Sequence, residues 1–446
     1  MDKIYVRGGI PLQGSIRVSG SKNASLPLMA ACLLVDGVTT LHNVPDIRDI
    51  HTMAEMLQEV GAEVRFSTDG VVKIDATGFC RTSAPEELVR KMRASFYVLG
   101  PMLARLGHAR VAQPGGCDIG ARPVDFHIKG LRALGADVRN DGGIVEASAE
   151  KLVGARIYLD FPSAGATTHL MTAACMAEGV TIIENAATEP EVVDLAHFLC
   201  SLGGQVTGAG TSTVIIEGVK QLRAGAEYSV IPDRMEAGTY ACAAAITRGD
   251  LILENVVPAH LQPVLVKLRD MGVTLEQLDE DENAPGRLRV SMKGRCRAVD
   301  ILAMPHPGFP TDMQQPMVAL LSVSEGAAMV TDRVFENRFR YVSELQRMGA
   351  DVRVEGRTAF VHGVPQLTGA VVTSTDLRAG AAMIVAALAA EGESTIGGVE
   401  HVDRGYDALV EKLQSVGAEI TRTAAERDLA LPTLAAPAGK PDATVV

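Results

Sequence analysis

Two kinds of apolar segment alternate along the chain. The first kind is apolar on every side and rich in alanine, as in SLPLMAACLL (25–34), THLMTAACMA (168–177) and GAAMIVAALAA (380–390). The second kind carries apolar residues on one face only, as in DIHTMAEMLQEV (49–60) and YDALVEKLQSV (406–416). A helix that is apolar all round must be buried, whereas a helix with a single apolar face lies at the surface. The pattern therefore predicts pairs of inner and outer helices.

A short phrase at the end of each one-faced segment shows that these pairs repeat. It consists of an apolar residue, a glycine, a small residue, often an acid, and a second apolar residue. Its glycines are Gly61, Gly135, Gly203, Gly272, Gly349 and Gly417. Glycines also follow the inner segments, as expected at helix ends, and short β-branched runs come next. The sequence therefore predicts six units of about 70 residues, each helix–strand–helix–strand.

Six units of about 70 residues are together too long for a single hydrophobic core. Because a single core grows poorly beyond about 300 residues, we expect two groups of three units. The segment from 428 to 446 is rich in Ala and Pro and has no periodicity, so we expect a disordered tail.

Composition narrows the possible functions. The 446 residues include 54 acids and 42 bases, for a net charge of −12, which disfavours a general nucleic-acid binder. The chain shows neither a signal peptide nor an apolar run long enough to span a bilayer. The seven cysteines include no CxxC pair, so neither a disulfide framework nor a zinc site is indicated. We expect a cytoplasmic protein with reduced thiols, and an anionic ligand would need a local basic pocket.

Basic residues recur where the predicted helices begin. A cation is unfavourable at the positive end of a helix, so their recurrence at equivalent positions indicates a ligand with several negative charges. The alternative is that they pair with nearby acids such as Asp49, Asp376 and Asp403. The basic residues are Lys22, Arg93, Arg122, Arg378 and Arg404.

Two acidic or nucleophilic side chains stand out beside them. Cys117 lies in the glycine-rich stretch PGGCDIGARPVDFH (114–127), where Arg122 could depress its pKa and make it reactive. The alternative is a small loop residue that happens to be cysteine. Asp312 begins an inner helix in FPTDMQ, as a site residue or simply as a helix cap. His127 is interpreted as a hydrogen-bonding loop residue.

A set of motifs resembles a known family. In chain order they are GSKNASLPLMAA, RASFYVLGPMLAR, PGGCDIGARPVD, PDRMEAGT, FPTDMQ, VFENRF, TDLRAGAA and HVDRGYD, between about residues 1 and 423. Together they resemble the UDP-N-acetylglucosamine 1-carboxyvinyltransferases, a family of enolpyruvyl transferases. The resemblance implies an α/β fold of two inside-out α/β barrels with three repeats each. The implied domains are 1–21 with 232–427, and 22–231.

The resemblance also implies a reaction, the first committed step of peptidoglycan synthesis. The 3-hydroxyl of UDP-N-acetylglucosamine attacks C2 of phosphoenolpyruvate while C3 is protonated, and the tetrahedral intermediate then loses phosphate. It implies no metal and no cofactor, and no partner beyond these two substrates. The oligomeric state stays open.

Residue roles follow from the same motifs. Cys117 would be the proton donor, Asp312 the base at the 3-hydroxyl, and Lys22 a catalytic residue that also binds substrate. Phosphoenolpyruvate would be held by Lys22, Arg122 and Arg404. The UDP-sugar would contact Asn23, Arg93, Arg122, Pro123, Val124, Asp125, Phe126, Phe161, Pro162, Ser163, Ala164 and Val334. The cleft would be supported by Arg338, Asp376 and Arg378.

The sequence departs from the family pattern at a few positions. Some relatives carry Lys at the position of Phe161, so the backbone would have to contact the diphosphate there. Thr168 and His169 also differ. Other readings are an enolpyruvyl transferase for a nucleoside or for shikimate 3-phosphate, although the shikimate enzyme lacks the PGGCDIGARP loop. A non-catalytic nucleotide-sugar sensor would be expected to have lost Cys117, Asp312 or Lys22.

Overall fold

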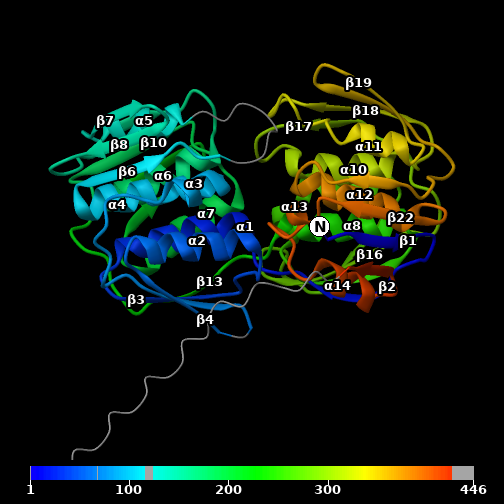
Figure 1. Ribbon diagram of the computed structural model, residues 1–446, viewed down its shortest axis with the longest axis horizontal. Coiled ribbons are helices and arrows are strands. Elements are labelled where there is room, and N and C mark those ends of the chain that lie inside the picture. Colours follow the sequence, from blue (N-terminus) through cyan, green and yellow to red (C-terminus); the bar gives the residue numbers. More distant parts are fainter. Residues whose placement is uncertain (1, 68, 116–123, 424–446) are drawn as a thin grey trace, which may run out of the picture.

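The computed structural model describes residues 2–67, 69–115 and 124–423 and has two lobes side by side (Figure 1). One hydrophobic core joins buried residues from Ile4 to Val18 with those from Met235 to Ile420. A second core joins buried residues from Ala24 to Val230. We call the first the discontinuous lobe and the second the continuous lobe.

Three inner helices fill the centre of each lobe. In the continuous lobe they are α1 (Lys22–Ala31), α4 (Leu99–Leu106) and α6 (Ala164–Ala174). In the discontinuous lobe they are α8 (Arg234–Ile246), α10 (Gln314–Leu321) and α12 (Leu377–Ala389). Every residue of α8 and of α10 is buried, as the all-round apolar pattern requires.

One-faced helices cover the flanks of both lobes. The continuous lobe has α2 (Arg48–Glu59), α5 (Asp125–Ala133) and α7 (Pro190–Ser201). The discontinuous lobe has α9 (Gln262–Asp270), α11 (Val342–Arg347) and α14 (Leu409–Ser415). Inner and outer helices therefore occur six times each among the described residues, and this confirms the predicted alternation.

Each lobe carries three small sheets outside its inner helices. In the continuous lobe their orders are β13-β3-β5-β4, β6-β8-β7 and β11-β12-β10-β9. The strands are β3 (Val38–His42), β4 (Glu63–Ser67), β5 (Val71–Asp75), β6 (His108–Ala112), β7 (Asp137–Asp141), β8 (Ile144–Ser148), β9 (Arg156–Tyr158), β10 (Val180–Glu184), β11 (Gln205–Thr207), β12 (Thr213–Glu217) and β13 (Glu227–Ser229).

The discontinuous lobe repeats this arrangement with the orders β21-β22-β1-β23, β15-β16-β14-β2 and β17-β18-β20-β19. Its strands are β1 (Ile4–Arg7), β2 (Gln13–Arg17), β14 (Asp250–Val256), β15 (Thr274–Gln277), β16 (Gly286–Ser291), β17 (Ile301–Ala303), β18 (Ala327–Asp332), β19 (Asp351–Glu355), β20 (Thr358–His362), β21 (Val371–Thr373), β22 (Glu393–Gly397) and β23 (Glu419–Arg422). Helices inside and sheets outside make each lobe an inside-out α/β barrel.

Most units contain more strands than the two that the sequence pattern predicts. In most units the second predicted strand is one arm of an antiparallel hairpin, such as β4 with β5 or β19 with β20. A short parallel strand adds a further edge in five sheets, as β9 does beside β10. In the three-stranded sheet a parallel bridge from Ser83 to Arg110 takes that place. Four of these five edge strands have only three residues, too few to leave a periodic signal.

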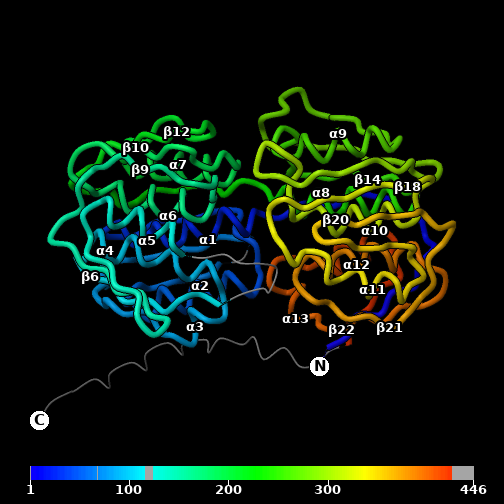
Figure 2. The backbone as a smooth tube through the Cα atoms, turned by 90° about the horizontal axis from the view of Figure 1, so that it is seen from above, coloured from blue at the N-terminus to red at the C-terminus, as the bar shows by residue number. Residues whose placement is uncertain are grey.

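The two passages between the lobes run side by side. Gly20 and Pro232 form an antiparallel bridge, the Ser21 amide donates to the Ile231 carbonyl at 2.7 Å, and the Asp233 amide donates to the Ser19 carbonyl at 2.8 Å. Helices α1 and α8 begin directly after these passages, so both start at the boundary between the lobes (Figure 2). Within the described residues, no helix is long and apolar enough to cross a membrane.

Candidate active site

A cleft of about 580 Å³ lies between the lobes, where inner helices of both begin. The continuous lobe contributes the first residues of α1 and α6 and the start of the 3₁₀ helix Arg93–Val98. The discontinuous lobe contributes the starts of α8 and α12 and the 3₁₀ turn Thr311–Met313 that precedes α10. Free backbone N–H groups at helix starts make such a cleft suited to anions.

Most of the residues expected at the site line this cleft. They are Lys22, Asn23, Arg93, Val124, Phe126, Phe161, Pro162, Ser163, Ala164, Asp312, Val334, Arg338, Asp376, Arg378 and Arg404. Asp125 instead borders an adjoining hollow, together with Arg93 and Phe126. Cys117, Arg122 and Pro123 lie outside the described residues, whereas Pro114 and Val124, on either side of that segment, both line the cleft.

One buried carboxylate joins two of the expected phosphate-binding cations. Asp49, on the first turn of α2, accepts from Lys22 Nζ at 3.3 Å and from Arg404 Nε at 2.9 Å. The Asp49 side chain is only 4% exposed, whereas those of Lys22 and Arg404 are 12% and 19% exposed. Asp49 therefore holds the side chains of Lys22 and Arg404 in place from the buried side, and both cations still line the cleft. Since Arg404 belongs to the other lobe, this ion pair also bridges the boundary.

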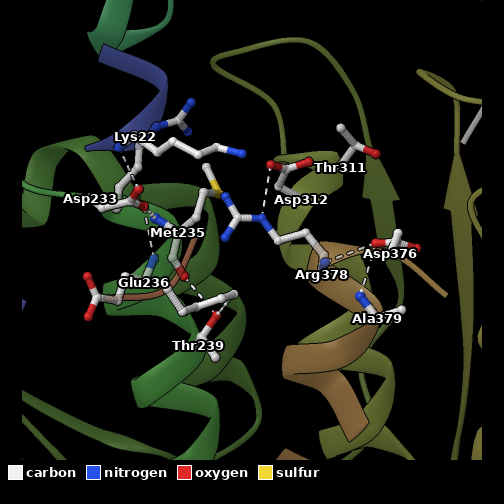
Figure 3. A network of polar contacts seen from close by, with 12 residues as sticks. Lys22, Asp233, Met235, Glu236, Thr239, Thr311, Asp312, Asp376, Arg378 and Ala379 are labelled. Carbon is white, nitrogen blue, oxygen red and sulfur yellow. Dashed lines mark hydrogen bonds and ion pairs between the residues drawn. The ribbon is translucent and has the colours of Figure 1, made fainter. Parts of the chain in front are cut away.

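A second carboxylate faces the first pair across the cleft. Arg378 Nε donates to Asp312 Oδ2 at 3.1 Å, and Arg338 donates to Asp312 Oδ1 (Figure 3 shows the pair with Arg378). Burial by itself would raise the pKa of Asp312. The charges of Arg378, Arg338 and Lys22 outweigh burial and hold that pKa well below its ordinary value. Asp312 is therefore an ionised acceptor at neutral pH.

Helix caps position these groups. Asp376 caps α12 by accepting from the amides of Arg378 and Ala379 at 2.9 and 3.1 Å, which sets the direction of the Arg378 side chain (Figure 3). Ser163 caps α6 in the same way, through the Ala166 amide. Asp332 is fully buried and accepts from the Val334 amide at 2.8 Å and from Thr311 Oγ1 at 2.6 Å. It therefore ties the loop carrying Val334 to the turn carrying Asp312.

Two guanidinium nitrogens in this cluster have unused donors. Arg338 Nε and Arg378 Nη1 are buried, and neither finds a hydrogen-bond partner among the described residues. A buried charged donor without an acceptor is costly. In addition to Lys22, Arg93, Arg338, Arg378 and Arg404, Arg234 brings a further positive charge to the lining. The cleft is thus rich in cations although the chain carries −12 overall.

The sequence missed two contacts around the cleft. Glu191 on α7 forms a buried, two-pronged ion pair with Arg234 on α8, at 2.9 and 3.1 Å. Thr188 donates to the carbonyl of His306 at 3.0 Å. Both contacts join the two lobes, and no local pattern marks them because the partners lie 43 and 118 positions apart. The interpretation of His127 as a loop residue was wrong, because it lies on α5, but it does form a hydrogen bond, with His169.

The described residues contain no group of three or more His, Cys, Asp or Glu side chains placed to hold a metal ion. The acids that line the cleft are mostly paired with cations, as Asp49, Glu191 and Asp312 are. The cations that line the cleft suit anion binding, and the ionised Asp312 can accept a proton.

Comparison with known proteins gives a consistent picture. Residues 6–413 match the family model described as EPSP synthase (3-phosphoshikimate 1-carboxyvinyltransferase). UDP-N-acetylglucosamine 1-carboxyvinyltransferase 2 of Carboxydothermus hydrogenoformans is 51% identical over 422 residues, 95% of this chain and 99% of that protein. UDP-N-acetylglucosamine 1-carboxyvinyltransferase of a Nostoc species is also 51% identical, over 95% of this chain and 94% of that protein.

Solved structures share the architecture. The enolpyruvyl transferase NikO from Streptomyces tendae superposes with a TM-score of 0.85 at 26% identity, over 95% of this chain and 99% of that one. An EPSP synthase from Acinetobacter baumannii superposes with a TM-score of 0.74 at 21% identity, over 95% and 100%. The second similarity speaks for the fold alone, and both confirm the predicted two-lobed α/β architecture.

Proposed function

The chain belongs to the UDP-N-acetylglucosamine 1-carboxyvinyltransferase family, and from that premise we propose that it transfers the enolpyruvyl group of phosphoenolpyruvate to the 3-hydroxyl of UDP-N-acetylglucosamine and releases phosphate. In this reaction the hydroxyl oxygen bonds to C2 as C3 gains a proton. The C–O bond to phosphate then breaks while C3 loses a proton. The enzyme would thereby supply the first committed precursor of peptidoglycan.

The observation that carries the proposal is the pairing of two cation clusters across one cleft. Lys22 with Arg404, and Arg338 with Arg378, face the same space, and each pair is organised around one carboxylate. Both proposed substrates are phosphate-bearing anions, so this arrangement matches their charge. The composition of the whole chain offers no such match, because it is acidic.

We assign phosphoenolpyruvate to the Lys22 and Arg404 side of the cleft, with Arg122 as the third cation. Asp49 already balances one of the two positive charges, so the side chains are held in place without being fully neutralised. A dianionic phosphate approaching from the cleft would meet two oriented donors whose ordering is already complete. Such preorganisation reduces the entropy that binding must spend.

We assign the role of base at the sugar 3-hydroxyl to Asp312. Its low pKa keeps it ionised, as a base must be before it accepts a proton, but the same cations weaken its affinity for that proton. Bound phosphoenolpyruvate would offset part of the positive charge of Lys22. Its arrival would therefore raise the proton affinity of Asp312 when the hydroxyl is in place.

We assign the UDP-sugar to the continuous-lobe wall. Ser163 and Ala164 present the amino end of α6 to the cleft, a position suited to a diphosphate oxygen. Asn23, Arg93 and Phe126 line the same wall, with Phe161 and Pro162 beside them, and Val334 faces it from the other lobe. Asp125 and Pro123 would complete the nucleotide contacts, and Cys117 would protonate C3.

The acceptor decides between this function and its alternatives. Phosphate release from phosphoenolpyruvate should be supported by UDP-N-acetylglucosamine, and should stay at background with shikimate 3-phosphate or UMP. The 51% identity to UDP-N-acetylglucosamine enzymes against 26% to NikO favours this order. Turnover with either other acceptor alone would replace the proposal, and no turnover with any acceptor would favour a non-catalytic role.

A further inference from the structure

Two buried imidazoles meet in the wall of the cleft. His127, on the first turn of α5, is 7% exposed, and His169, on the inner helix α6, is fully buried. Their Nδ1 atoms lie 3.1 Å apart, within hydrogen-bond distance. Gly130, one turn further along α5, lets the helices approach, because a Cβ there would lie 2.3 Å from the Leu170 side chain.

A hydrogen bond between two Nδ1 atoms needs one donor and one acceptor. In a neutral imidazole one ring nitrogen carries the proton and the other carries a lone pair. Burial lowers the pKa of His169 to about 3, and burial, His169 and Arg93 lower that of His127 well below its usual value. Both rings are therefore neutral at pH 7. Two arrangements of the protons make this bond. If His169 donates from Nδ1, His127 carries its proton on Nε2; if His127 donates from Nδ1, its Nε2 carries a lone pair.

The surroundings of His169 Nε2 select between these arrangements. This nitrogen is buried and has no hydrogen-bond partner among the described residues. A Cβ built on Gly100 would lie 3.1 Å from both Nε2 and Cδ2 of His169, so Gly100 packs against this edge of the ring. A buried N–H group without an acceptor is rarer in proteins than a buried acceptor without a donor, so Nε2 is better left as a lone pair. The proton of His169 therefore belongs on Nδ1, from which it is donated to His127 Nδ1.

His127 then carries its own proton on Nε2, on the side of the cleft. A Cβ built on Gly165, in the first turn of α6, would lie 3.7 Å from both His127 Nε2 and the Tyr97 hydroxyl. All three residues line the cleft. We propose that His169 is a positioning residue: its Nδ1–H bond orients His127 as an uncharged Nε2–H donor toward an anionic oxygen of the nucleotide sugar. The ligand in this inference rests on the proposed function, whereas the pairing does not.

Ring nitrogen NMR of the whole protein, labelled with ¹⁵N-histidine and free of substrate, tests the pairing directly. The His127 signals are identified as those lost in His127→Gln. The expected spectrum at pH 7.5 has the His127 proton on Nε2 and the His169 proton on Nδ1. A His127 proton on Nδ1 would overturn the proposal. This measurement needs no substrate, so it stands even if turnover with UDP-N-acetylglucosamine is absent and the proposed function fails.

Kinetics of two His169 variants test whether the bond to His127 supports binding of the nucleotide sugar. His169→Leu removes the Nδ1–H donor, and the KM for UDP-N-acetylglucosamine should rise roughly tenfold, the usual scale for a hydrogen bond to a charged group. The KM for phosphoenolpyruvate and kcat should change less than twofold. His169→Asn places an amide N–H where Nδ1–H lies and should restore most of the affinity. Thr172→Val, which alters another buried polar side chain on α6, is the matched control.

Two kinetic outcomes contradict the proposal. The first is an unchanged KM for the nucleotide sugar in His169→Leu. The second is an equal loss in His169→Asn and His169→Leu, which would indicate a purely structural role in packing the two helices.

Discussion

At the scale of single residues, Asp312 combines a low pKa with a position between two arginines. Asp312→Asn keeps the shape and one acceptor oxygen but cannot accept the hydroxyl proton. We expect kcat to fall roughly a hundredfold or more, with UDP-N-acetylglucosamine binding retained in calorimetry. Asp137→Asn, on an exposed strand, is the control. Near-native turnover of Asp312→Asn would leave this residue with a structural role only.

Cys117 is expected to be the one cysteine that fosfomycin labels. This epoxide phosphonate resembles phosphoenolpyruvate, so Lys22 and Arg404 should hold its phosphonate while a thiolate opens the ring. Burial raises the pKa of Cys175 and of Cys296 to about 12, which makes both unreactive. Mass spectrometry should therefore find a single adduct. Cys80 and Cys200 are exposed and serve as internal comparators.

Substitutions at Cys117 separate acid from nucleophile. Cys117→Asp keeps an ionisable acid and should retain turnover while resisting fosfomycin. Cys117→Ser provides neither an effective acid nor a thiolate and should lose most activity. Adducts on another cysteine, or full activity in the serine variant, would remove Cys117 from the proposed mechanism.

Asp194 gives the protein a pH-dependent stability unrelated to catalysis. It is 2% exposed and accepts from the Tyr228 hydroxyl at 2.7 Å, and burial raises its pKa from 3.8 to about 7. Between those values the folded state binds the proton more tightly than the unfolded chain. Stability therefore falls as pH rises from about 4 to about 7, by up to about 1.4 kcal/mol per unit, and stays lower above that range.

Asp194→Asn keeps an acceptor for Tyr228 and removes the ionisation. Its denaturation midpoint should exceed that of the wild type at pH 8, and this advantage should shrink at pH 5. Exposed Asp137→Asn should show no such pH dependence. An Asp194→Asn effect of equal size at both pH values would contradict the assignment.

At the scale of elements, the glycine that ends each outer helix has a backbone reason. The six glycines have φ between +88° and +108°, a region that side chains rarely adopt. The glycines after the inner segments behave alike in five units, at Gly37, Gly107, Gly179, Gly326 and Gly392. In the fourth unit Arg248 takes the positive φ, and Gly249 is needed because a Cβ would lie 2.3 Å from the Leu12 carbonyl.

Gly417→Ala tests this reason without a steric complication. Nothing lies within 4 Å of a Cβ at Gly417, so only its φ of +95° resists the substitution. We expect a loss of about 1 kcal/mol, seen as a lower denaturation midpoint. Gly294→Ala is the matched control, because that glycine is equally open and lacks the positive φ. Equal effects of the two substitutions would argue against backbone strain.

At the scale of the whole molecule, polar contacts around the cleft join the two lobes. Asp49 with Arg404, Glu191 with Arg234 and Thr188 with the His306 carbonyl all join them. Each lobe has its own hydrophobic core, so one lobe can move against the other without breaking either core. Within the part of the chain that the structure describes, the lobes are connected covalently by the two passages beside Gly20 and Pro232.

We therefore expect substrate to draw the lobes together. Small-angle X-ray scattering with saturating UDP-N-acetylglucosamine should give a smaller radius of gyration than the free protein, because in the proposed site the nucleotide sugar would contact both walls. UMP lacks the N-acetylglucosamine that would reach Val334 and Asp312, so it should compact the protein less. An unchanged radius with UDP-N-acetylglucosamine would count against a site between the lobes.

Much of this architecture could be predicted from local pattern. All-round apolar segments gave the inner helices, one-faced segments gave the outer helices, and the repeated glycine gave the six units. Which face of a helix is buried, and where the backbone needs a glycine, depend largely on residues within a few helical turns, so local sequence can predict both. The short edge strands escaped because three residues carry too little periodicity, and 428–446 lies outside the described residues.

Local pattern was enough to predict that basic and acidic residues stand at helix starts, as Lys22, Asp312 and Arg378 do. Local pattern left open whether the basic residues bind a ligand or pair with neighbouring acids. The structure shows that Lys22 and Arg404 do pair with an acid, Asp49, and that both also line the cleft. Tertiary structure alone decided the partners: Asp49 meets Arg404 across 355 positions, and Arg378 meets Asp312 across 66. The reason is physical, because a buried charge needs a counter-charge in space, and the distance along the chain does not enter that requirement.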